Sequence, residues 1–146
     1  MIVAALALAG IFVALYLLLY KLGMIGALSC AVGSCETVNS SKWATFLGLP
    51  VAGWGVAFYI GMFVLAMVST REDFAESRTI SGLVLAVATT GLLFSAWLTY
   101  LELFVIHAVC QWCVVSAVIV AIIFVVSLAD YGEKSRKEGG GTPIPD

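Results

Sequence analysis

Four long apolar runs dominate this chain of 146 residues and leave little room for any other kind of structure. They cover residues 2–20, 51–68, 80–106 and 109–128. A helix needs about 17–25 apolar residues to cross a bilayer, and only helices and closed barrels satisfy all their backbone hydrogen bonds in lipid. The composition agrees, with 62% hydrophobic and 11% charged residues. We therefore predict an all-α membrane protein, built as a bundle of four transmembrane helices.

The basic residues indicate how the bundle is oriented. Cytoplasmic connections of membrane proteins carry an excess of Lys and Arg. Two of the seven Lys and Arg residues, Lys21 and Lys42, lie in the long loop 21–50, and the other five lie between the second and third runs or after the fourth. We therefore expect both termini to be cytoplasmic, and the loop 21–50 and the turn 102–108 to face outside. The formal net charge of −2 gives no reason to expect a nucleic-acid partner.

The chain divides into one membrane domain and a short tail. Residues 1–130 contain all four apolar runs, and we predict that residues 131–146 form a disordered cytoplasmic tail. Three successive glycines followed by two prolines cannot continue a helix and bury little surface. The sequence shows no attached soluble domain, so a soluble reaction partner is expected on a separate chain.

The outer loop carries a second helix signal. Asn39 or Ser40 can cap a short helix, and Gly48 and Pro50 can end it. Such a helix would lie at the membrane interface and cover the bundle with one apolar face. That face would consist of Trp43, Phe46 and Leu47.

Four cysteines form two pairs that the predicted topology places on the same side of the membrane. Cys110 and Cys113 open the fourth run as a Cys-x-x-Cys motif, and Cys30 and Cys35 lie in the outer loop. Free amide N–H groups at a helix start favour a thiolate, which makes such a pair reactive. Two inert pairs or a zinc site made of all four cysteines are the alternatives. We favour a redox relay, from thiols outside to a lipid-soluble acceptor.

Three other side chains near the outer surface are candidates for a role. Glu102 and His107 precede the motif closely, and an ionisable residue at membrane depth is a functional candidate. His107 could carry a proton, although both residues could equally lie among the lipid headgroups. Trp97 lies at least a turn below the surface, where it could form part of a ring-binding pocket.

The combined pattern resembles the vitamin K epoxide reductase family, and more narrowly its bacterial disulfide-forming members. The resemblance covers about residues 1–130. Its motifs are Cys30-x4-Cys35, the run Val38-Asn39-Ser40-Ser41-Lys42-Trp43, Gly48-Leu49-Pro50, and Cys110-x-x-Cys113 at the start of the last helix. It implies a four-helix bundle around a quinone, either menaquinone or ubiquinone, in a bacterial inner or plasma membrane.

The resemblance also implies roles for individual residues. Cys113 would lie next to the quinone, Cys35 would exchange with Cys110, and Cys30 would meet a soluble periplasmic or extracellular thioredoxin-like protein. The position of Ser41 matches a hydroxyl near the quinone, and that of Trp43 matches an aromatic residue of the loop. The implied function is that of a membrane thiol oxidase, which drives disulfide formation and passes electrons to a quinone.

Two departures from the animal members concern epoxide reduction. Ala117 stands where they have a tyrosine, and Val51 lies near the place of their asparagine. We therefore expect quinone reduction rather than epoxide reduction. A small four-helix transporter of mercuric type, which also uses paired cysteines, is the rival from another class. A structural protein braced by a loop disulfide is the third alternative.

Overall fold

Four long helices form the protein, as the apolar runs predict. The computed structural model describes residues 1–140. The long helices are α1 (Ile2–Lys21), α3 (Val51–Ser69), α4 (Arg78–Leu101) and α5 (Gln111–Gly139). A wider π-helical turn, η2 (Glu102–Ile106), continues α4. All four are long and apolar enough to cross a membrane, which confirms the predicted fold class.

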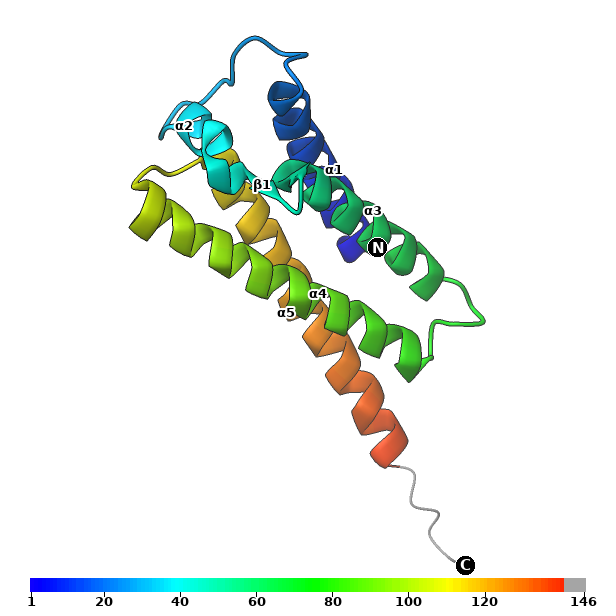
Figure 1. Cartoon of the computed structure of the whole chain (residues 1–146). Helices are drawn as coiled ribbons and strands as arrows, with labels where there is room; N and C mark the ends of the chain where they lie inside the picture. The colour runs from blue at the N-terminus through cyan, green and yellow to red at the C-terminus, as the bar shows by residue number, and fades with distance from the viewer. Residues whose placement is uncertain (141–146) are drawn as a thin grey trace, which may run out of the picture.

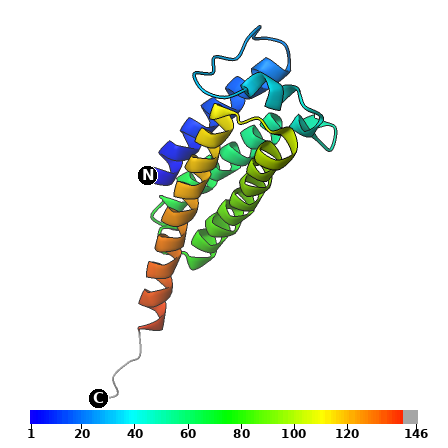
Figure 2. The same cartoon turned by 90° about the vertical axis from the view of Figure 1, so that its left-hand side faces the viewer.

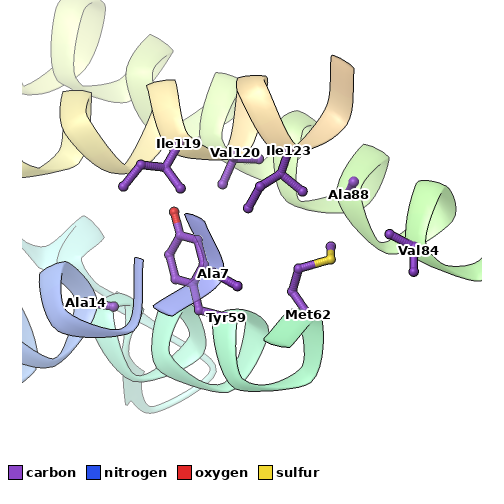
Figure 3. Close-up of a cluster of buried hydrophobic side chains, with 9 residues drawn as sticks. All are labelled: Ala7, Ala14, Tyr59, Met62, Val84, Ala88, Ile119, Val120 and Ile123. Atoms are coloured by element: carbon purple, nitrogen blue, oxygen red, sulfur yellow. The ribbon is translucent and has the colours of Figure 1, made fainter. Parts of the chain in front are cut away.

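The helices pack in two main pairs. α1 lies chiefly against α3 and α4 chiefly against α5, while α1 also contacts α5 and so joins the pairs (Figures 1 and 2). The centre holds Tyr59, Met62 and Ile123, all almost fully buried (Figure 3). Gly10 of α1 faces the Tyr59 ring so closely that a Cβ atom would overlap it. Small residues at such contacts let membrane helices approach.

The outer loop folds over one end of the bundle (Figure 1). It contains the short helix α2 (Cys35–Ser40), a 3₁₀ turn η1 (Lys42–Ala44), and the antiparallel strands β1 (Thr45–Phe46) and β2 (Leu49–Pro50). The prediction of a short helix in this loop is confirmed, but the predicted placement over residues 39–48 is wrong. Leu47 and Gly48 have φ angles of 52° and 80°, which suit a tight turn and not a helix.

Contacts with the bundle explain why the hairpin replaces the predicted helix. Phe46 packs edge-on against the rings of Trp54, Phe94 and Trp97. The indole N–H of Trp54 donates a hydrogen bond of 3.1 Å to the Phe46 carbonyl. These tertiary contacts fix the hairpin on the ends of α3 and α4 that lie next to the loop.

The predicted disordered tail is wrong for residues 131–139, because α5 continues to Gly139. Pairs of opposite charge one helical turn apart stabilise this extension: Lys134 with Asp130, and Lys137 with Glu133. Arg78 at the start of α4 also pairs with Glu138 at 3.3 Å. Residues 141–146 of the predicted tail lie outside the described part of the chain.

Candidate functional site

Cys30 and Cys35 are joined by a disulfide in the outer loop, with their Cα atoms 6.4 Å apart. Cys35 is the first residue of α2 and is buried, whereas Cys30 lies in the irregular segment before it and is half-buried. The more accessible sulfur of this disulfide therefore belongs to Cys30, and the more deeply placed one to Cys35.

Cys110 and Cys113 are free thiols at the start of α5, where the sequence places them. Cys110 is the N-cap residue and is fully buried; Cys113 lies in the first turn and is half-buried. A hydrogen bond with the Cys113 thiol lowers the pKa of the Cys110 thiol below its usual range, although burial acts in the opposite direction. In the reduced pair Cys110 is therefore the better thiolate.

The backbone holds the two cysteine pairs against each other. Gly33 pairs with Cys110 in an antiparallel bridge, and the Ser34 N–H donates a hydrogen bond of 2.9 Å to the Val109 carbonyl. Gly33 has a φ angle of 95°, and a Cβ atom there would overlap the Val109 oxygen, so this position needs glycine. Cys35 and Cys110 consequently belong to one buried cluster.

The two residues inside the Cys-x-x-Cys motif bind the loop. The Gln111 side-chain oxygen accepts hydrogen bonds from the backbone N–H groups of Ala31 and Val32, at 3.1 and 3.2 Å. The Trp112 indole N–H donates to the Ser29 carbonyl at 3.0 Å. We call Gln111 and Trp112 the loop clamp. The sequence analysis missed this role; the only available signal was a polar amide and an indole between the two cysteines.

Tyr16 of α1 extends this contact across the bundle. Its hydroxyl accepts a hydrogen bond of 2.9 Å from the Ser29 N–H, and its ring meets the Trp112 ring edge-on at 5.3 Å. The loop segment that leads to Cys30 is therefore held by both α1 and α5.

A cavity of about 360 Å³ opens beside the active-site cysteines. Cys113 lines it, whereas Cys110 is not among the described residues that do. Most of the lining is apolar or aromatic, as in sites for flat, apolar ligands. Its aromatic side chains include Trp43, Phe46, Trp54, Phe58, Tyr59 and Phe94. A quinone ring fits this chemistry.

The loop residues predicted near the quinone lie at this cavity. Ser41 and Trp43 both line it, and Trp43 is 38% exposed. The Ser41 hydroxyl donates a hydrogen bond of 2.7 Å to the Val38 carbonyl. Trp97, which we predicted on the cavity wall, is not among the described residues that line it; its ring centroid lies 6.1 Å from that of Phe46 and 5.8 Å from that of Phe94.

Several polar groups lie on the cavity wall. Asn39 was read as a helix cap and as part of the loop motif, but it also lines the cavity and is 8% exposed. Tyr59 hydrogen-bonds the Ser116 hydroxyl at 2.7 Å, and both line the cavity. Glu102 also lines it, whereas His107 is exposed and lies outside the lining set. Nothing in the sequence distinguishes the depth of Glu102 from that of His107.

The comparison with known families agrees with this arrangement. The model of the vitamin K epoxide reductase family matches residues 1–128, which include all four cysteines and all four long helices up to Leu128. The chain therefore belongs to the vitamin K epoxide reductase family, whose members are quinone-dependent thiol–disulfide oxidoreductases of the membrane.

Proposed function

We propose that this protein is a membrane thiol oxidase of the disulfide-forming branch of the family. It takes electrons from a reduced thioredoxin-like protein outside the cytoplasm and passes them to a membrane quinone, ubiquinone or menaquinone. The observation that carries the proposal is the position of the Cys-x-x-Cys pair between two environments. Cys110 is buried in one cluster with Cys35 of the loop, while Cys113 lines the apolar cavity.

The positions of the sulfur atoms support one order of transfer. Cys30 is the more accessible end of the loop disulfide, so a thiol of the soluble partner attacks there. Cys35 then exchanges with Cys110, which lies in the same buried cluster. Re-formation of the Cys110–Cys113 disulfide releases two electrons and two protons. The quinone, when bound, supplies a two-electron acceptor within the membrane.

Two cavity residues favour the disulfide-forming branch over epoxide reduction. Val51 and Ala117, which stand near the polar positions of the animal members, both line the cavity. Each presents an apolar side chain there, so neither position can donate a hydrogen bond to an epoxide oxygen. The wall at these two points suits a quinone ring, which is largely apolar.

The orientation of the bundle is also part of the proposal. The cysteine loop lies at one end, and the α3–α4 connection, with Arg71, lies at the other (Figures 1 and 2). By the positive-inside rule, the cysteines face outside in a bacterial plasma membrane and both termini are cytoplasmic. An impermeant maleimide should label the reduced cysteines in intact cells, and a reporter fused after Asp146 should be active in the cytoplasm. Labelling only after the membrane is broken would contradict this orientation.

The deciding experiment mixes purified, pre-reduced protein in lipid nanodiscs with a short-chain quinone in the presence of a metal chelator. We expect quinol to form in step with disulfide. The Cys113→Ala variant should form no quinol, while its Cys30–Cys35 disulfide should still exchange with a soluble dithiol. Steady quinone reduction by Cys113→Ala would contradict the assignment.

The mercuric-type transporter is the alternative that this experiment also addresses. Among residues 1–140, no group of three or more His, Cys, Asp and Glu side chains lies close enough together to hold a metal ion. Family membership likewise favours the oxidoreductase. Stoichiometric binding of a soft metal without quinone turnover would favour the transporter.

A further inference from the structure

Among the described residues, Glu102 carries the one carboxyl group on the wall of the cavity that Cys113 lines. Glu102 is 4% exposed and lines the cavity together with Cys113. Its side chain accepts a hydrogen bond of 3.0 Å from the backbone N–H of Cys110, three residues before Cys113. Glu102 therefore lies both at the start of α5 and on the wall of the cavity that Cys113 lines.

The local fold explains how an acidic side chain is tolerated at this depth. Cys110 is the N-cap of α5, so its N–H points out of the positive end of a helix of 29 residues. A carboxylate that accepts this N–H receives both a hydrogen bond and a favourable dipole, which offset part of its desolvation cost. Glu102 is also the first residue of the π-helical turn η2, and such turns are frequent at functional sites.

The redox step requires that protons move as well as electrons. The reduced pair holds protons that must leave before an S–S bond can form, and the quinone must gain two protons to become a quinol. A thiolate at Cys113 next to an ionised Glu102 would place two negative charges in one buried site, which is unfavourable. A proton passed from the thiol to the carboxylate leaves the number of charges unchanged.

We propose that Glu102 accepts the proton of the Cys113 thiol and then delivers it into the cavity. This proton transfer rests on the quinone reduction proposed above. In the first step the S–H bond of Cys113 breaks and an O–H bond forms on Glu102, so a thiol and a carboxylate become a thiolate and a carboxylic acid. In the second step that O–H proton passes to an oxygen of the reduced acceptor, and the carboxylate is restored. Glu102 is therefore a catalytic residue that acts as a general base and then as a general acid.

The first test follows the thiol alone and needs no quinone. In the Cys110→Ala variant, Cys113 is the only cysteine of the motif, and its alkylation by a membrane-permeant reagent requires loss of its proton. Adding Glu102→Gln keeps a side-chain oxygen for the Cys110-position N–H but removes the proton acceptor. We expect alkylation at neutral pH to slow by roughly 100-fold, the lower end of the usual range for general-base catalysis.

The sign of this effect separates a proton acceptor from a structural or purely electrostatic group. If Glu102 only repelled the thiolate, its replacement by Gln would speed alkylation; if it only positioned the helix start, Gln would leave the rate unchanged. Either outcome would overturn the proposal. Glu102→Asp should restore part of the rate. Glu36→Gln is the matched control, because Glu36 is exposed on α2 at the same end of the bundle, and it should have no effect.

The second test measures quinol formation in a single turnover with all four cysteines present. Glu102→Gln should slow this step by about 100-fold, while the dissociation constant of the quinone, measured by quenching of tryptophan fluorescence, stays within about twofold. An equal loss of affinity and rate would show that Glu102 only shapes the cavity, and would overturn the proposal. The unmutated protein could form no quinol while its alkylation still depends on Glu102. That result would contradict the proposed function but would still support proton transfer from the thiol to Glu102.

Discussion

The loop clamp makes a quantitative prediction about the exchange between the two cysteine pairs. The double variant Gln111→Met/Trp112→Phe keeps a side chain of similar length at position 111 and an aromatic ring at position 112. It removes three hydrogen bonds to the loop, two made by Gln111 and one by Trp112. A hydrogen bond contributes about 0.5–1.5 kcal/mol net, and these three are exposed, so the lower end applies. Together they amount to roughly 1.5 kcal/mol. This is equivalent to about a tenfold change in the equilibrium between the loop docked on α5 and the loop released from it.

A tenfold smaller docked fraction should slow transfer between Cys35 and Cys110 by the same factor, provided docking is fast. The assay starts with a reduced loop pair and an oxidised active-site pair, quenches with acid, and maps the remaining free thiols at successive times. Quinone reduction driven by a small dithiol that reaches Cys110 directly should keep its rate. Gln111→Glu retains an acceptor oxygen, so its exchange should stay close to the unmutated rate. Unchanged exchange in the double variant would refute the reasoning that the clamp holds the loop in place.

Three further predictions concern individual side chains. Cys30→Ser should trap a Cys35–Cys110 disulfide, because the competing loop thiol is absent; peptide mapping that finds no such link would contradict the transfer order. Cys113→Ala removes the hydrogen bond that lowers the Cys110 pKa, so the pH profile for alkylation of Cys110 should move to higher pH, and a shift to lower pH would contradict this cause. Asn39→Ala removes a buried amide from the cavity wall, and quinone affinity, followed by fluorescence quenching, should fall about fivefold, or about 1 kcal/mol; an unchanged affinity would show that the amide does not bind the ring.

The long helices could be predicted because hydrophobicity alone determines them. Each apolar run is long enough to span the bilayer, and a helix is the only way for an open chain to satisfy its backbone there. The cysteine positions followed just as directly from the motif. The described part of the tail was mispredicted. The glycines and prolines indicated that the helix ends early, whereas the pairs Asp130–Lys134 and Glu133–Lys137 extend α5.

The loop and the cavity wall could not be predicted in the same way, because contacts distant in sequence determine them. The hairpin of residues 45–50 depends on Phe46 meeting Phe94 and Trp97 of α4, which local propensity does not encode. Asn39 looks like a helix cap in the sequence and becomes a cavity residue only when α2 lies over the bundle. The predicted wall residue Trp97 does not line the cavity, but its ring packs against Phe46 and Phe94, which do.

The separation of Cys110 from Cys113 has a consequence for the protein as a whole. Cys110 is buried against the loop and Cys113 opens on the cavity, so the route described for electrons from the loop to the quinone passes through the disulfide that these two residues form. Protons cannot follow that route, because a disulfide carries none. A separate acceptor on the cavity side of the pair would take them, and Glu102 lies there, hydrogen-bonded to the backbone of Cys110 and on the cavity wall with Cys113. The same turn that ends α4 thus places a proton carrier beside the point where electrons leave the protein.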